Sequence, residues 1–209
     1  MLFRSVVMIV PTWCGQSAEG EARLAPFFKL GTLLAGSLNV TPYGRSLTVF
    51  DPYLVNGQRE IMETCWLTAL DGRSIEVFVR AMEMAVSSGC AIFTHEFKGA
   101  ASRVPEEATA FGLRRDHILI EILAGFVDRS DKLEGRQHQD WVRTTRESFD
   151  VMALPGAYPN LLGAGDDRVL KSYGRNAKRL IEAKRRYDPD NVFFSTIPLP
   201  RDRAMAGAA

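Results

Sequence analysis

The chain has 209 residues, of which 46% are hydrophobic, and a formal net charge of +1. This length is enough to bury a full core in one domain, or in one domain with an appendage. Acidic and basic residues are spread through the chain, which gives no electrostatic footprint for nucleic acid and argues against a dedicated DNA or RNA role. No apolar run approaches the ~20 residues of a membrane-spanning helix, so neither nucleic acid nor a membrane is an expected partner.

The three cysteines, Cys14, Cys65 and Cys90, lie far apart and form no CxxC pair. An odd and scattered set indicates neither a disulfide framework nor a zinc site, and a cytoplasmic location is the simpler expectation. The three histidines are too scattered to indicate a metal site. The apolar run at residues 5–10 stops at Pro11, too early for a secretion signal, and is interpreted as a buried first strand.

Strands and helices alternate along the first half of the chain. After the first strand, apolar residues at helical spacing predict a helix within residues 17–30. An extended segment at 61–67 precedes a helix at 74–86 with one apolar face. Gly89 is well placed to end that helix, and residues 91–95 form the third predicted strand.

The clearest strand is the apolar run at residues 117–126. It is followed by a polar stretch at 129–139, a helix at 141–152 and a turn-rich loop at 155–166. A long helix at 169–186 ends where proline and turn residues follow. These elements predict an α+β fold, in which helices pack on one face of a mostly antiparallel sheet.

Tyr158 and Asn160 are the first candidate site residues, in a glycine-flanked loop between two predicted helices. In extended backbone this spacing points both side chains the same way. A phenol and an amide aimed at one place can grip the polar edge of a planar cofactor or a sugar chain. The alternative is a plain helix connection with a tyrosine plug and an asparagine turn cap.

Glu121 is the second candidate because it interrupts an apolar strand. A buried carboxylate is costly unless it is paired, and burial raises its pKa towards the range useful for proton transfer. The period of two puts His117 and Leu119 on the same strand face. The alternative is a structural salt bridge to an arginine, or a sheet edge where the carboxylate meets water.

Two histidines and a small-residue segment give weaker signals. His95 ends an apolar strand beside the segment at residues 99–104, where small side chains would let a ligand approach the backbone. A lone histidine there is more often packed and hydrogen-bonded, and His138 lies in a polar run where solvation is expected. The chain has no GxGxxG, GxxxxGK(S/T) or GxSxG motif in its required context, so phosphoryl transfer and serine hydrolysis lose support.

The C-terminal part of the sequence resembles the closing signature of the berberine-bridge-enzyme-like FAD-linked oxidases. The matching stretches are YGRNAKRL at residues 173–180 and KRRYDPDNVF at residues 184–193. Upstream, GAASRVP at residues 99–105 and ATAF at residues 108–111 are similar to a small-residue segment of that family and its sequel. The loop Tyr158-Pro159-Asn160 lies where the family has Tyr-x-Asn.

The resemblance implies one part of a two-domain flavoprotein with FAD as its cofactor and a small molecule as its substrate. The glycine-rich FAD-binding segment and the covalent attachment residues of the family have no counterpart in this sequence. An FAD-binding domain, on a separate or missing stretch of chain, is therefore the expected partner. We expect residues 1–155 to form the substrate-binding α+β domain, residues 156–200 the C-terminal berberine-bridge-type segment, and residues 201–209 a disordered tail.

The same resemblance implies roles for single residues. Tyr158 and Asn160 would border the flavin, and Tyr173 and Asn176 would support their loop from the last helix. Several members have a tyrosine base directly after that asparagine, where this chain has Leu161. Glu121 is then the candidate for proton abstraction, from an alcohol or an activated C–H group, while hydride passes to the flavin.

A second hypothesis comes from a different class of protein. The chain would be a non-catalytic α+β binding or interaction domain, and would form a homodimer through the face that an FAD-binding domain covers in the family. Such a face should be apolar, because large apolar patches are rarely left bare on a monomer.

Overall fold

The computed structural model describes residues 5–52, 56–127, 132–163, 166, 168–195, 197 and 199, and the backbone alone at 132–134. The chain divides into two compact units, residues 1–57 and residues 58–209. The tail that we expect to be disordered, residues 201–209, lies outside the described residues. None of the helices in the described ranges is long and apolar enough to cross a membrane.

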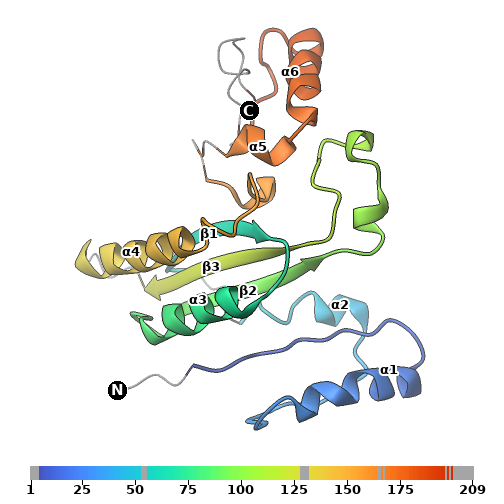
Figure 1. Ribbon diagram of the computed structural model, residues 1–209, viewed down its shortest axis with the longest axis vertical. Helices are drawn as coiled ribbons and strands as arrows, with labels where there is room; N and C mark the ends of the chain where they lie inside the picture. The colour runs from blue at the N-terminus through green and yellow to red at the C-terminus, as the bar shows by residue number, and fades with distance from the viewer. Residues whose placement is uncertain are drawn as a thin grey trace. The chain divides into compact units, whose positions relative to one another are not determined.

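The first unit contains short helices and no strand among its described residues. Helix α1 spans Ser17–Leu24, a 3-10 helix spans Ala25–Lys29, and α2 spans Tyr43–Ser46 (Figure 1). Pro26 lies at the start of the 3-10 helix, where its missing N–H ends the regular α-helical bonding of the predicted helix. The predicted strand at residues 5–10 is wrong: no described strand pairs with it, and its side chains are exposed.

The second unit is built on a three-stranded antiparallel sheet. Strand β1 spans Gln58–Leu67, β2 spans Cys90–Phe97 and β3 spans His117–Val127. The order is β1-β3-β2, so the most apolar strand lies in the middle (Figure 1). All three strands predicted for this part of the chain are confirmed, and each is longer than the pattern indicated. The α+β class is confirmed as well.

Helix α3, Gly72–Glu83, begins at a capping box. The Asp71 carboxylate accepts the Ser74 amide at 2.9 Å, and the Ser74 hydroxyl accepts the Asp71 amide at 2.8 Å. The helix ends at Glu83, so Gly89 does not cap it as predicted. Instead the Gly89 carbonyl accepts the Gly125 amide of β3 at 2.9 Å. A side chain at Gly89 would collide with the Gly125 carbonyl, so this close approach requires glycine.

Helix α4, Lys132–Ser148, begins inside the polar stretch at 129–139, before the start of the helix predicted at 141–152. His138 is buried there, which corrects the expectation that it is solvated. Its ring stacks on Phe126 with centroids 4.7 Å apart, and its Nε2 lies 2.8 Å from the Ser87 hydroxyl. Phe126 and Ser87 allow the polar His138 side chain to be buried. Both partners are distant in sequence, so the polarity of the stretch alone led to the wrong expectation that His138 is solvated.

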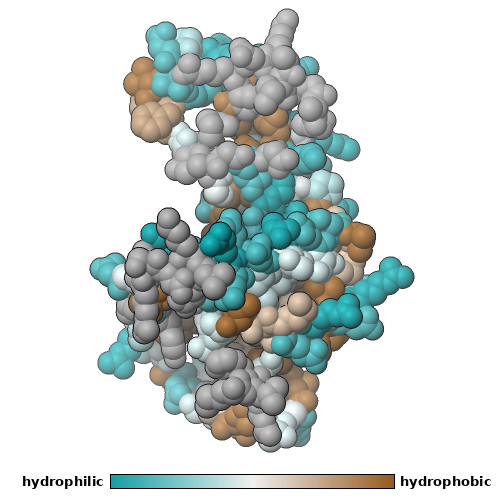
Figure 2. Space-filling model, turned by 90° about the vertical axis from the view of Figure 1, so that its left-hand side faces the viewer, coloured by the Kyte–Doolittle hydropathy of each residue, from teal (hydrophilic) through white to brown (hydrophobic). Residues whose placement is uncertain are grey.

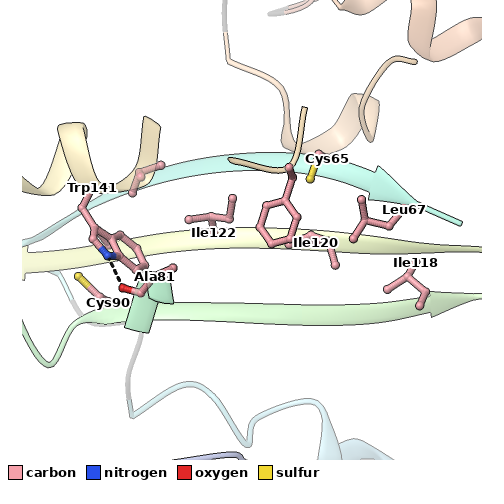
Figure 3. Packing of buried hydrophobic residues seen from close by; sticks show 11 residues of the cluster. Cys65, Leu67, Ala81, Cys90, Ile118, Ile120, Ile122 and Trp141 are labelled. Atoms are coloured by element: carbon pink, nitrogen blue, oxygen red, sulfur yellow. Dashed lines mark hydrogen bonds between the residues drawn. The ribbon is translucent and has the colours of Figure 1, made fainter. Parts of the chain in front are cut away.

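The main core lies between the sheet and the helices α3 and α4. Alternate side chains of β3, from Ile118 to Ala124, point to this side together with Cys65 and Leu67 of β1 (Figure 3). Trp141 of α4 reaches across and donates its Nε1–H to the Ala81 carbonyl of α3 at 2.9 Å. That bond satisfies the indole nitrogen inside the core and ties the two helices together.

Two 3-10 helices, Ala101–Arg103 and Glu106–Ala108, lie between β2 and β3, and a third, Pro159–Leu161, follows α4. The long helix predicted at 169–186 is wrong in one respect: it is two helices, α5 at Val169–Tyr173 and α6 at Asn176–Tyr187. The break is at Gly174, whose φ of +53° is open to glycine and strained for other residues.

The chain turns sharply after α6. The Asp188 carboxylate accepts the amides of Val192 at 2.7 Å and Phe193 at 3.1 Å, and also pairs with Lys184. These bonds hold the segment that follows the helix, although its apolar side chains stay exposed. Figure 2 shows brown apolar side chains beside a teal polar surface at its top. The exposed apolar residues after α6 are Val192, Phe193 and Phe194.

Candidate functional site

The sheet face opposite α3 and α4, which we call the second face, carries the candidate residues of β3. The strand period of two places His117, Leu119 and Glu121 there, because Ile118, Ile120 and Ile122 point into the helical core. The register sets Glu121 opposite Thr64 of β1 and opposite Phe93 of β2. The second face therefore has a carboxylate in its central strand, between two neighbouring strands.

Glu121 has a partner that the sequence did not reveal. His95 of β2 brings its Nε2 to 3.2 Å from Glu121 Oε2. The Glu121 side chain is 17% exposed and the His95 side chain is 50% exposed, so the pair lies between the protein and solvent. The sequence indicates which residues alternate within each strand. Only the pairing of β2 with β3, which sets His95 opposite Leu119, shows that His95 and Glu121 are diagonal neighbours.

Five aromatic rings gather on the second face beyond Leu119. We call them the aromatic cluster; its members are Trp66, Phe97, Phe111, His117 and Tyr158. The rings contact one another at centroid distances of 4.9 to 6.4 Å, mostly edge-on or tilted. The cluster brings Tyr158, from the loop after α4, to the same sheet face as Glu121.

His117 is buried in the middle of the aromatic cluster. Burial lowers its pKa, although the Arg115 carbonyl, 2.7 Å from Nδ1, acts in the other direction. Since a carbonyl only accepts, Nδ1 carries the hydrogen and Nε2 is left as an acceptor. That atom, Trp66 Nε1 and Thr64 Oγ1 are buried without a hydrogen-bond partner among the described residues. All three belong to side chains of the second face, and such orphaned groups are costly.

The loop that holds Tyr158 and Asn160 is tied to helix α5. Ser172 accepts the Ala157 amide at 2.9 Å and donates to the Arg168 carbonyl at 2.8 Å. The two candidates are joined to each other, because the Asn160 amide donates to the Tyr158 hydroxyl at 3.1 Å. Tyr158 is half-buried against the aromatic cluster and Asn160 is exposed, so the loop presents an amide at its surface.

The other two candidates, Tyr173 and Asn176, have different neighbours. Tyr173 packs against the small buried group of Ala157, Leu162 and Val169, and so lies beside the Tyr158 loop. Asn176 is buried and donates to the carbonyls of Glu106 at 2.7 Å and Thr109 at 3.0 Å. It therefore holds the segment that leads to Phe111, and not the loop it was expected to support.

Arg168 is a residue of this region that sequence reasoning missed. Its guanidinium donates to the Thr64 carbonyl at 2.6 Å and to the carboxylates of Glu63 and Asp166. Burial acts to raise the pKa of Asp166, but the hydrogen bonds and charge of Arg168 outweigh it and hold that pKa below its ordinary value. Arg168 thus fixes the outer edge of β1 at the residue opposite Glu121. No sequence signal distinguished it from the other arginines.

A groove of about 1570 Å³ lies on the other side of the sheet, between α3 and α4. Its lining includes the exposed apolar residues Ile75, Val79, Met84 and Val151. None of the candidate site residues lines it. In the described part of the chain, no group of three His, Cys, Asp or Glu side chains is arranged to hold a metal ion.

Comparison with known proteins agrees with the resemblance seen in the C-terminal motifs. The family model "Berberine and berberine like" matches residues 149–198. Two proteins of Bacillus subtilis strain 168, both named uncharacterized FAD-linked oxidoreductases, are similar over most of the chain. YgaK is 27% identical over 86% of this chain and 40% of its own length, and YvdP is 26% identical over 90% and 43%.

Solved structures show the same fold. BBE-like 28 from Arabidopsis thaliana superimposes with a TM-score of 0.72 at 18% identity, over 90% of this chain and 46% of its own. Berberine bridge enzyme from Eschscholzia californica gives a TM-score of 0.66 at 17% identity, over 90% and 44%. The chain therefore spans less than half the length of the relatives it matches.

Proposed function

We propose that this chain, a member of the berberine-bridge-enzyme-like FAD-linked oxidases, is the substrate-facing part of an FAD-dependent oxidoreductase. Its reaction is the oxidation of an alcohol or an activated C–H group in a small molecule, with hydride transfer to flavin. An FAD-binding part, on a separate or missing stretch of chain, completes the site. One observation carries the proposal: Glu121 and Tyr158 share one sheet face, with an aromatic surface beside them.

The residues of the second face fit a flat group with polar edges. Aromatic rings of the cluster offer surfaces for packing, and Tyr158 and Asn160 offer a hydroxyl and an amide. The orphaned atoms of Thr64, Trp66 and His117 belong to the same face. In the proposal Tyr158 and Asn160 border the flavin. Tyr173 packs beside their loop from α5, and Asn176 holds the segment before Phe111 from α6. When bound, FAD supplies the hydride acceptor.

Glu121 is the group that removes the substrate proton in this proposal. Its side chain is largely shielded yet not sealed from solvent, as a general base needs. Leu161 occupies the position after Asn160, where a tyrosine base would otherwise lie, and a leucine side chain cannot move a proton. Glu121 is also a carboxylate at the centre of the second face, between Thr64 of β1 and Phe93 of β2, where it can meet a substrate that lies on this face.

The experiment is reconstitution with an FAD-binding part. We expect the chain alone to be colourless, to bind FAD weakly, and to oxidise a substrate only after completion. Glu121→Gln should then lower kcat by about 100-fold or more, the usual contribution of a general base. Glu96→Gln is the matched control, because Glu96 pairs with Lys98 and points to the other sheet face. Tight stoichiometric flavin in the chain alone would overturn the incomplete-site part, and unaffected turnover in Glu121→Gln would make Glu121 structural.

An interaction domain that forms a homodimer is the second candidate function. The exposed apolar residues of the α3–α4 groove favour it, and they place the dimer contact on the sheet side opposite the proposed flavin site rather than on the face that an FAD-binding domain would cover. Analytical ultracentrifugation separates the two: a dimer without flavin affinity supports this candidate, and a monomer excludes it. For both candidate functions we propose a cytoplasmic location. Its support is that Cys14, Cys65 and Cys90 are free thiols, which the reducing cytoplasm maintains.

A further inference from the structure

We propose that His95 is the residue through which Glu121 exchanges its proton with solvent. The inference rests on the proposed role of Glu121 and assigns a second residue to the same site. A base that takes a proton in every turnover must release it before the next one. Glu121 is only 17% exposed, whereas the histidine in contact with it is 50% exposed.

The contact between the two side chains defines their hydrogen bond. Glu121 Oε2 and His95 Nε2 are 3.2 Å apart. An ionised carboxylate only accepts, so in the resting pair the hydrogen is on Nε2 of His95. The second ring nitrogen, Nδ1, belongs to a half-exposed imidazole, from which water can take or return a proton.

The proton route is balanced. After Glu121 takes a proton from the substrate, the half-exposed imidazole first changes tautomer through water, gaining a proton at Nδ1 and losing one from Nε2. Nε2 then accepts the Glu121 proton, and Nδ1 releases its proton to water. In total one proton enters at the carboxylate and one leaves to water, so the pair returns to its resting charge and tautomer. No redox change occurs in the pair itself.

The surroundings leave His95 as the near proton partner of Glu121. The other titratable groups that the strands place on the second face are Glu60 of β1 and His117 of β3, and Tyr158 reaches this face from its loop, where its hydroxyl accepts from Asn160. Glu60 and His117 each lie four residues along their strands from the row of Glu121, roughly 13 Å away. Arg168 approaches from beyond β1 but is engaged by Thr64, Glu63 and Asp166.

The pairing is tested on the full chain, without flavin, by NMR of nitrogen-15-labelled histidine. The His95 signals are identified by their loss in His95→Gln. We expect the neutral ring to be held as the Nε2–H tautomer, and we expect this preference to be lost in Glu121→Ala. It should persist in Glu96→Ala, which removes the carboxylate next to His95 in sequence but on the other sheet face. An Nδ1–H ring, or a tautomer unchanged by Glu121→Ala, would overturn the inference.

The proton route is tested in the chain completed with an FAD-binding part. His95→Gln keeps a donor for Glu121 but cannot carry a proton, so kcat should fall about tenfold or more. Added imidazole buffer should restore turnover of this variant and leave the parent unchanged, which a structural role would not produce. If Glu121→Gln is inactive while His95→Gln is fully active, this inference fails and the proposed function stands. If Glu121→Gln is fully active, the proposed role of Glu121 fails first.

Discussion

The Ser172 hydroxyl accepts the amide hydrogen of Ala157 at 2.9 Å, and this bond joins helix α5 to the start of the Tyr158 loop. Ser172 is buried, and its hydroxyl donates a hydrogen bond to the Arg168 carbonyl. The loop is thus positioned by a helix that follows it in the chain. Two segments 15 residues apart depend on one side chain.

Ser172→Ala should free the Ala157 amide and loosen the loop. A buried donor left without its acceptor costs about 1–3 kcal/mol of unfolding free energy. Hydrogen exchange at Ala157 should accelerate, and a urea transition should shift to lower denaturant. Ser148→Ala is the control, because its exposed hydroxyl bonds only to Thr144 within α4. Unchanged exchange at Ala157 would show that Ser172 does not hold the loop.

Gly156 should tolerate no side chain. Its φ is +85°, and a Cβ there would lie 2.8 Å from the Ser172 backbone. Gly99 has a similar φ of +72°, but a Cβ there would meet nothing within 4 Å. Gly99→Ala therefore measures the backbone strain alone, roughly 1–2 kcal/mol. Gly156→Ala should cost distinctly more in urea unfolding, and equal costs would contradict the collision with α5.

The strands could be predicted because their signal is local. Apolar runs at 61–67, 91–95 and 117–126 each became a strand, since a sheet with one helical face needs alternate apolar side chains. The run at 5–10 has the same composition, yet no described strand pairs with it. Composition indicates the capacity to form a strand, whereas a partner strand decides whether it does.

The misjudged helices depend on contacts that sequence spacing does not contain. The start of α4 was missed because the partners of His138, Phe126 and Ser87, are distant in the chain. The break between α5 and α6 was hidden by an apolar spacing that continues across Gly174. The contact of His95 with Glu121 depends on strand register in the same way, so both residues were noted from the sequence but their contact was not predicted.

Asn176→Ala should destabilise the segment that carries Phe111. The buried amide donates to the carbonyls of Glu106 and Thr109, which then lose their partner inside the protein. We expect a loss of about 1–3 kcal/mol in urea unfolding, with a weaker near-ultraviolet circular dichroism signal from the aromatic cluster. Lys178→Ala, an exposed change in the same helix, should do neither. A full aromatic signal in Asn176→Ala would contradict this coupling.

His117 should make the stability of the chain depend on pH. Burial lowers its pKa below the ordinary 6.5, so the folded protein keeps the ring neutral where the unfolded chain binds a proton. Unfolding then takes up a proton as the pH falls below about 6.5, and stability decreases with falling pH until the lowered pKa is reached. Urea midpoints measured from pH 7.5 to pH 5 should show this decrease. In His117→Gln, which cannot titrate, the decrease should be smaller; an identical pH dependence in both proteins would mean that the buried ring is not its source.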